Sequence, residues 1–307
     1  MCTSVALRRS ELFFGRNMDI DYSFDERVVV TPENFPLYFK KMPPCEKHYA
    51  IIGMAAVADN YPLYAEGMNE NGLCMAALKF EGNAYYCSED VKGKSMAAPY
   101  ELIPFVLGKC RNLSETKALL RETDIADIPF KEQLPLSPLH WHIADKSGSI
   151  VVERTREGLN IYDNPADVLT NNPPFPFHLH NISLYSQLSP QYECISNGFS
   201  PFGAGFCTVG LPGDFSSPSR FVKAHYLLKN SSETIDGTAQ LFHILENTAI
   251  PCGAVLNVDG KNHYTTYSCC MDTEKKSYFF KTYTGGIREI KLSGETAKES
   301  QLIQYAL

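Results

Sequence analysis

The sequence predicts an α+β protein with mainly antiparallel sheets. Segments with the periodicity of strands gather in two blocks, and segments with helical periodicity gather in two others. A doubly wound parallel sheet would instead alternate strand and helix along the chain. Two strand-rich and two helix-rich blocks fit two sheets packed face to face, each with an outer layer of helices.

The first strand block occupies the N-terminal part of the chain. In residues 3–8, the side chains of Thr3, Val5 and Leu7 alternate with those of Ser4, Ala6 and Arg8, which is the period of two typical of a strand. Asn71-Gly72 lies between two such segments and is a type I′ hairpin signal. Further strands are expected at 11–15, 27–31, 50–58, 61–69 and 73–80.

The period then changes to that of helices. A helix is expected at 100–111, where Pro104 leaves the start open, and a second at 115–122 behind a Ser114 cap. The remaining helical block covers 218–229 and 238–248. Strands are expected at 139–145, 149–154 and 158–163 before this block, and at 264–271, 277–283 and 287–292 after it.

Composition and charge narrow the class of protein. The chain has 307 residues, 44% hydrophobic and 21% charged, with no linker, charge block or repeat, so a single domain over 1–307 is expected. A net charge of −7 argues against nucleic acid or an anionic membrane as partner. The start lacks the order of a secretory signal, and no run of about 18 apolar residues occurs. We therefore expect a cytoplasmic protein.

The ten cysteines are too sparse for a disulfide scaffold, and their expected state is reduced. Cys74, Cys110, Cys207 and Cys270 lie in apolar runs, which is typical of small buried hydrophobic residues. Cys269 and Cys270 could form a redox pair. Neighbours on a strand point to opposite faces, however, which favours two unrelated core thiols.

Cys2 stands out because of its place in the chain. An initiator methionine is normally trimmed before a small residue, which would give Cys2 a free α-amine. Such an amine titrates near ~7.7–8.0 and a thiol near ~8.5, so one residue can supply both nucleophile and general base at neutral pH. By itself the position favours an ordinary second residue that happens to be cysteine.

The segment Phe14-Gly15-Arg16-Asn17-Met18-Asp19 follows on the next expected strand. A cation beside Cys2 would favour its thiolate, and the Asp19 carboxylate could hold the α-ammonium or orient the thiol. Hairpin pairing of 3–8 with 11–16 would bring Arg16 close to Cys2. A surface salt bridge fits the spacing equally well.

Two later segments contain unusual local choices. Asn171 and Asn172 stand at an expected strand end before two prolines, where they suit either an oxyanion hole or an Asx turn, and these residues alone favour the turn. Further on, Ser217 is the expected N-cap of a helix and Pro218 its first residue. Arg220 then falls in the first turn, which the helix dipole disfavours by about 0.3–1 kcal/mol. This indicates that Arg220 serves a site or a buried partner.

Together and in this order, these segments resemble the choloylglycine hydrolase family, the bile salt hydrolases and penicillin V acylases of the N-terminal-nucleophile hydrolase superfamily. The resemblance runs nearly from end to end. It implies a four-layer αββα sandwich of two mainly antiparallel sheets. The matching motifs are Met1-Cys2-Thr3, Phe14-Gly15-Arg16-Asn17, Leu169-Thr170-Asn171-Asn172-Pro173, Gly210-Leu211-Pro212-Gly213-Asp214 and Ser217-Pro218-Ser219-Arg220-Phe221.

The resemblance also implies roles for the site residues. Cys2 would be the nucleophile, Arg16 and Asp19 would surround it, Asn171 would supply an oxyanion-hole amide, and Arg220 would organise charge around the thiol. Lys79 is a departure: bile salt hydrolases carry Asn at the matching position, and penicillin V acylases tend to carry Tyr.

The family uses the backbone N–H at this position in its oxyanion hole, which lysine can supply, so only substrate preference is open. The Lys79 side chain could meet a substrate carboxylate or sulfonate, although a solvent-facing position is favoured.

The expected function is cleavage of the amide bond of glycine- or taurine-conjugated bile acids through a thioester on Cys2, without metal or organic cofactor. Alternatives are a penicillin V acylase or other N-acyl amide acylase, and a non-catalytic small-molecule binding protein. His140, His142, His178 and His180 form two His-x-His pairs that lack a convincing third ligand, so they are expected to be structural. Segment 185–215 resembles the family's assembly excursion and suggests a homo-oligomer, with a homotetramer as one form.

Overall fold

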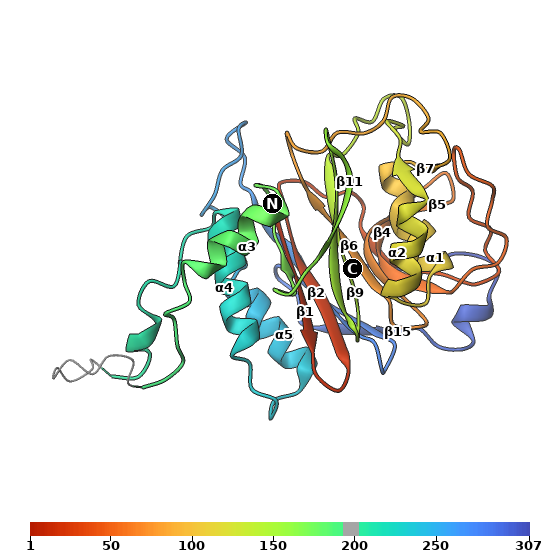
Figure 1. The fold of residues 1–307 in the computed structure, drawn as a ribbon. Coiled ribbons are helices and arrows are strands. Elements are labelled where there is room, and N and C mark those ends of the chain that lie inside the picture. The colour runs from red at the N-terminus through yellow and green to blue at the C-terminus, as the bar shows by residue number, and fades with distance from the viewer. Residues whose placement is uncertain (193–202) are drawn as a thin grey trace.

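The computed structural model describes residues 1–192 and 203–307, and its centre consists of two large sheets packed face to face (Figure 1). The first sheet has six strands, all paired antiparallel. In spatial order these are β12 (Val168–Leu169), β1 (Cys2–Arg8), β2 (Leu12–Ile20), β13 (Tyr264–Asp272), β14 (Ser277–Thr282) and β15 (Arg288–Lys291).

The second sheet has eight strands and is also antiparallel throughout. Its spatial order is β11 (Gly158–Asp163), β10 (Gly148–Thr155), β9 (Leu139–Asp145), β6 (Cys74–Lys79), β5 (Tyr61–Asn69), β4 (Ile51–Ala58), β3 (Arg27–Thr31) and β16 (Ile303–Tyr305). A separate short parallel pair joins β7 (Ser95–Ala97) to β8 (Thr123–Ile125).

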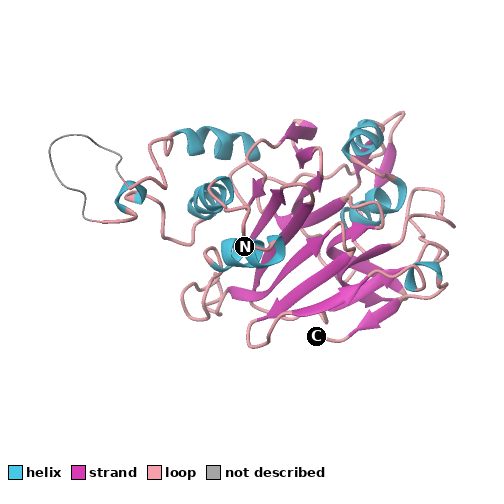
Figure 2. Ribbon diagram, turned by 90° about the horizontal axis from the view of Figure 1, so that it is seen from below, coloured by secondary structure: helices cyan, strands magenta, loops and turns pink. Residues whose placement is uncertain are grey.

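Helices form the two outer layers, as Figures 1 and 2 show. The eight-stranded sheet is covered by α1 (Leu102–Lys109), which follows the 3₁₀ turn η1 (Pro99–Glu101), and by α2 (Leu113–Arg121). The six-stranded sheet is covered by α4 (Ser217–Lys229) and α5 (Gly237–Glu246), and α3 (Phe175–Ser183) packs on α4. Two further 3₁₀ turns are η2 (Phe206–Thr208) and η3 (Thr296–Lys298). The predicted α+β architecture with two mainly antiparallel sheets and outer helices is confirmed.

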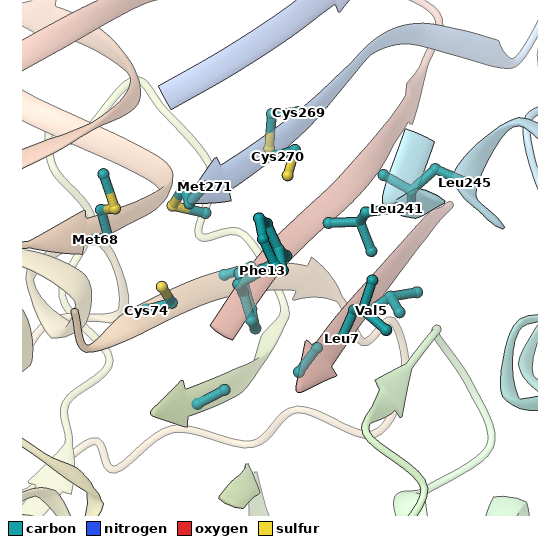
Figure 3. Close-up of a cluster of buried hydrophobic side chains, with 14 of the residues drawn as sticks. Val5, Leu7, Phe13, Met68, Cys74, Leu241, Leu245, Cys269, Cys270 and Met271 are labelled. Carbon is teal, nitrogen blue, oxygen red and sulfur yellow. The ribbon is translucent and has the colours of Figure 1, made fainter. Parts of the chain in front are cut away.

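The main hydrophobic core fills the space between the sheets and the space under α4 and α5. Figure 3 shows Val5 and Leu7 of β1 beside Leu241 and Leu245 of α5. All four are buried, and full burial of one such side chain contributes about 1.5–3 kcal/mol. Burial of this kind on both faces of β1 and β2 fixes the strands that carry the N-terminal segment.

Two helices begin elsewhere than the sequence predicted. Helix α2 is capped by Asn112, whose side chain accepts from the N–H of Glu115 at 3.0 Å, and not by Ser114. Helix α4 is capped by Ser216, while the hydroxyl of Ser217 accepts from the N–H of Asn171. Tertiary hydrogen bonding thus moves the second cap by one residue.

The hairpin between β5 and β6 forms as predicted, but its turn type differs. The N–H of Gly72 donates to the carbonyl of Asn69 at 2.9 Å, and Gly72 has a φ of +82° while Asn71 does not have a positive φ. This is a turn closed by a left-handed glycine, since a type I′ turn needs positive φ at both central residues.

Among the described residues, the cysteines depart from expectation at one position. Cys74, Cys110, Cys269 and Cys270 are buried free thiols as predicted. Cys207 is disulfide-bonded, so the expected reduced state is wrong there. Part of the predicted assembly excursion, 193–202, lies outside the described residues. Among the helices that the structure describes, none has the length and apolar character needed to cross a bilayer.

Candidate active site

Cys2 is the first residue of β1, and its side chain is almost fully buried, with 4% exposed. Met1 precedes it in the structure, so the nitrogen of Cys2 is a peptide N–H. That N–H donates to Asn171 Oδ1 at 2.7 Å. The antiparallel register with β2 places Cys2 opposite Met18. The start of β1 therefore lies among the predicted site segments.

Arg16 reaches the thiol from β2, although the register places its backbone opposite Ser4. Cys2 and Ser4 share one face of β1, and the long side chain of Arg16 extends along that face. Its Nη2 lies 2.6 Å from Sγ of Cys2. Gly15 before it allows close packing against β13, because a Cβ there would lie 2.1 Å from the carbonyl oxygen of Cys269.

Asp19 lies on the opposite face of β2. Its Oδ1 accepts from Thr265 Oγ1 at 2.6 Å, and its Oδ2 lies 3.8 Å from Nη1 of Arg220. Among the residues that the structure describes, Oδ2 has no hydrogen-bond partner. The α-amine of Met1 donates to the carbonyl of Asp19 at 2.8 Å and lies 2.5 Å from Nε2 of His263. Burial lowers the pKa of this amine.

Asn171 follows the short strand β12 and joins three segments. Its Oδ1 accepts from the N–H of Cys2 at 2.7 Å and from Arg220 Nη2 at 2.9 Å. Its Nδ2 donates to the carbonyl of Lys79 at 2.8 Å, and its backbone N–H donates to Ser217 Oγ at 2.8 Å. All these partners are distant in sequence, so the side chain forms a tertiary junction and not a local Asx turn.

Arg220 projects from the first turn of α4 and is 1% exposed. Its Nη1 donates to the carbonyl of Cys2 and to Thr3 Oγ1, both at 2.6 Å, and its Nε donates to the carbonyl of Phe215 at 3.0 Å. Burial lowers the pKa of Arg220, an effect that Asp19 opposes. The dense set of acceptors offsets the unfavourable position near the helix N-terminus.

Lys79 presents its backbone and its side chain to different surroundings. The N–H of Phe80 donates to Pro138 of the β9 side at 2.8 Å, so the neighbouring Lys79 N–H and C=O point to the other edge of β6. The Lys79 carbonyl meets Asn171 on that edge. The ammonium is half-exposed and pairs with Glu81 at 2.9 Å. The structure thus agrees with the solvent-facing alternative for this side chain.

Glu66 belongs to the same cluster and was not predicted. It is fully buried on β5, and its Oε2 lies 3.3 Å from Nη1 of Arg16, whose own side chain is 0% exposed. The hydroxyls of Tyr267 and Tyr278 donate to its carboxylate. The available signal was one acidic residue within an otherwise uncharged strand segment, 61–69.

A buried His–Glu pair, in a role that the sequence did not predict, holds the Asn171 segment. His140 and Glu153, both fully buried, lie 3.1 Å apart. His140 Nε2 lies 3.0 Å from the carbonyl of Thr170, and Glu153 accepts from the N–H of Phe175 at 3.0 Å. The pair therefore binds both ends of the segment that carries Asn171, which restricts its position.

His142 and His178, of the two predicted His-x-His pairs, also have structural partners. His142 Nδ1 lies 2.7 Å from Ser4 Oγ, and His178 Nε2 lies 2.9 Å from the carbonyl of Asn171. Burial lowers the pKa of His142 to about 3 and that of His178 to about 4. Over 1–192 and 203–307, no group of three His, Cys, Asp or Glu side chains could hold a metal ion.

Comparison with known proteins shows which family has sequences similar to this chain. A sequence model described as "Linear amide C-N hydrolases, choloylglycine hydrolase family" matches residues 2–305. A "Bile salt hydrolase/transferase" of Lactiplantibacillus plantarum is 43% identical over 317 residues, covering 100% of this chain and 97% of the relative. Another of that description from Clostridium perfringens is 38% identical, covering 99% and 96%.

Solved structures agree with the fold. The C2A mutant of a conjugated bile acid hydrolase from Clostridium perfringens matches with a TM-score of 0.93 and 37% identity, covering 99% of this chain and 96% of that one. A penicillin V acylase from Agrobacterium tumefaciens matches with a TM-score of 0.78, covering 99% and 91%. Its 20% identity supports the shared fold alone.

Proposed function

The chain belongs to the choloylglycine hydrolase family and is a hydrolase of linear amide C–N bonds, and from this premise we propose that it cleaves glycine- or taurine-conjugated bile acids with Cys2 as nucleophile. The observation that carries the proposal is the contact between Arg16 Nη2 and Cys2 Sγ at 2.6 Å, within a buried cluster that also holds Asn171 and Arg220. The names of the relatives support the substrate class.

Acylation begins once removal of Met1 frees the α-amine of Cys2. This amine accepts the thiol proton, directly or through a water, and the thiolate attacks the amide carbonyl. The Asn171 side chain and the backbone N–H of Lys79 receive the developing oxyanion. Both groups already lie at one edge of β6, since Asn171 Nδ2 bonds the Lys79 carbonyl.

The tetrahedral adduct then collapses. The C–N bond breaks, the leaving nitrogen takes the proton from the α-ammonium, and glycine or taurine departs while the acyl group stays on Sγ of Cys2. Water attacks this thioester, with the same α-amine as general base, and releases the free acid and the thiol. Every proton and electron pair is supplied by the substrate, water and Cys2.

Two cations support the chemistry at the start of β1. Arg16 faces Sγ, where it stabilises the thiolate, and Arg220 donates to the Cys2 carbonyl at 2.6 Å. Asp19 supplies a buried carboxylate oxygen without a hydrogen-bond partner among the described residues. An α-ammonium on Cys2 is the natural partner for this oxygen, so Asp19 orients the base.

The first test of the scheme is Cys2→Ser together with mass spectrometry of both proteins. Both are expected to lack Met1, and the serine variant should lose most amide hydrolysis because a hydroxyl needs stronger activation than a thiol. Full activity of the serine variant would contradict the role of the thiol. An intact Met1 in fully active enzyme would remove the proposed base.

Substrate choice needs a direct comparison. Glycocholate, taurocholate and penicillin V should be offered side by side, and we expect the two bile salts to have the higher kcat/KM. Faster turnover of penicillin V would establish the acylase alternative. Tight binding without turnover, and without a trapped Cys2 thioester, would establish the non-catalytic alternative.

We propose further that the protein is cytoplasmic and assembles as a homotetramer through the segment around 185–215. Tyr192 and Val209 in the described parts of this segment, and Leu184 just before it, are exposed large apolar side chains, and burial of such residues favours association. Light scattering after size-exclusion chromatography should give four times the mass of 34.4 kDa. A monomer at working concentration would refute this assembly.

A further inference from the structure

Glu66 is a buried carboxylate that connects the two sheets. It lies on β5 of the eight-stranded sheet, next to a bulge between Met54 and Ala55 of β4. Tyr267 and Tyr278 stand on β13 and β14 of the six-stranded sheet, and their hydroxyls donate to Glu66 at 2.9 Å and 2.6 Å. Two tyrosine hydroxyls of one sheet therefore meet at one carboxylate of the other.

The third partner of Glu66 is Arg16, which lies between it and the nucleophile. Glu66 Oε2 is 3.3 Å from Arg16 Nη1, and Arg16 Nη2 is 2.6 Å from Cys2 Sγ. Arg16 Nη1 also donates to the carbonyl of Ala77 at 2.8 Å. The guanidinium is thus bonded on one side to a carboxylate and a carbonyl, and its other amino group faces sulfur.

Burial of these charged and polar groups costs desolvation free energy that apolar side chains would not cost. Burial raises the pKa of Glu66, and Arg16 with the two tyrosine hydroxyls opposes this shift. Burial also keeps the pKa values of Tyr267 and Tyr278 well above the ordinary value, so both phenols remain donors. Apolar side chains of similar volume often stabilise a core as well as a buried ion pair does or better, which points to a role beyond packing.

We propose that Glu66 is a positioning residue for the Cys2 thiol: through Arg16 it fixes where the guanidinium lies and limits how much positive charge the sulfur meets. The importance of this role of Glu66 for catalysis rests on the proposed function, in which Cys2 is the nucleophile. Its effect on the thiol can be measured without any substrate.

The proposal predicts effects of opposite sign from two neighbouring residues. Glu66→Gln keeps the size of the side chain but removes its negative charge and one of its two acceptor oxygens, so Arg16 becomes uncompensated and Cys2 should react faster at about pH 6, by roughly tenfold. Arg16→Met should make Cys2 slower at the same pH. Loss of both hydroxyls in Tyr267→Phe/Tyr278→Phe favours protonation of Glu66 and should act in the same direction as Glu66→Gln.

The experiment is iodoacetamide alkylation of the folded protein from about pH 5 to about pH 9. Modification of Cys2 is quantified by mass spectrometry of the N-terminal peptide, which separates it from the other thiols. The matched control is Glu101→Gln, because Glu101 is 1% exposed but bonds the N–H groups of Ala98 and Lys40 instead of Arg16. This control should leave the Cys2 profile unchanged.

A shift of the Glu66→Gln profile to lower pH, with the control unmoved, supports the proposal. An unchanged profile in a folded Glu66→Gln protein overturns it, because a purely structural role would lower the melting temperature only. If Glu66→Gln fails to fold, the tyrosine double variant decides by the same criterion. Failure to hydrolyse bile salts would refute the proposed function and leave this readout intact.

Discussion

Replacement of Asn171 by alanine tests the candidate oxyanion hole most directly. The side chain makes three hydrogen bonds, in which Oδ1 accepts from the Cys2 N–H and from Arg220 while Nδ2 donates to the Lys79 carbonyl. During the reaction Nδ2 would turn from this neutral carbonyl to a developing oxyanion. Only that last interaction is stronger in the transition state than in the ground state, so its loss acts on kcat.

The magnitude follows from the bonds that disappear. Removal of one oxyanion-hole donor typically costs about 100- to 1000-fold in kcat, or about 2.7–4 kcal/mol. Loss of the Oδ1 acceptor leaves a buried Arg220 donor with one partner fewer, which should cost about 1–3 kcal/mol of stability. Arg220 keeps the carbonyls of Cys2 and Phe215 and the hydroxyl of Thr3, so the protein should still fold.

Asn172→Ala is the matched control. Asn172 is the adjacent residue of the same type, and its Nδ2 bonds the carbonyl of Glu81 at 2.6 Å, but no hydrogen bond joins it to Cys2 or Arg220. We expect it to keep kcat within about threefold. The assay is release of glycine from glycocholate, with a thermal melt of each variant. Asn171→Ala with kcat within tenfold of the parent would refute the oxyanion role.

Three other outcomes are expected. Lys79→Gln should change kcat/KM less than about threefold on glycocholate and taurocholate alike, because the ammonium pairs with Glu81 in solvent; a selective loss on one substrate would contradict this. Unfolding free energy should fall as the pH drops from about 6.5, since the pKa values of His142 and His178 are lowered to about 3 and about 4 and the unfolded chain binds these protons more readily. The unfolding free energy should change by up to about 1.4 kcal/mol per pH unit for each histidine. Urea titrations of His142→Gln at several pH values should show that the contribution of one histidine is lost. Hydrolysis should be unchanged after dialysis against EDTA, and an activity restored only by added metal would refute the cofactor-free scheme.

The layered fold could be predicted from the sequence because its signals are local. Strand and helix periodicities depend on neighbouring residues, and they placed nearly all the long elements. Short strands such as β7 and β16 were missed, because three residues carry too little pattern and depend on the strand beside them. The cap of α4 is Ser216 and not the predicted Ser217 for a related reason, since the Ser217 hydroxyl accepts from the distant N–H of Asn171.

The site divides in the same way. Cys2, Arg16 and Arg220 could be singled out from local sequence. Cys2 stands where it can become the first residue, hairpin pairing brings Arg16 close to it, and Arg220 occupies a helix position that disfavours a cation. Glu66 and the role of His140 could not be predicted, because both depend on contacts with other residues, such as Tyr278 and Glu153. The partners of a buried charge can be far away in the sequence, so such residues around Cys2 could be identified only in the three-dimensional structure.

The geometry at the chain start also bears on the order of processing and folding. Met1 continues the pairing with β2, since its carbonyl accepts from the N–H of Asp19 at 3.1 Å while its α-amine bonds the Asp19 carbonyl and lies 2.5 Å from His263. A peptidase needs this amine and the following peptide bond exposed, but both are part of the folded sheet, and Cys2 is 4% exposed. Under the proposed function, in which Met1 is removed, trimming would precede the docking of β1 on β2. The α-ammonium of Cys2 would then join Arg220 Nη1, 3.8 Å away, as a cationic neighbour of the buried Asp19 Oδ2.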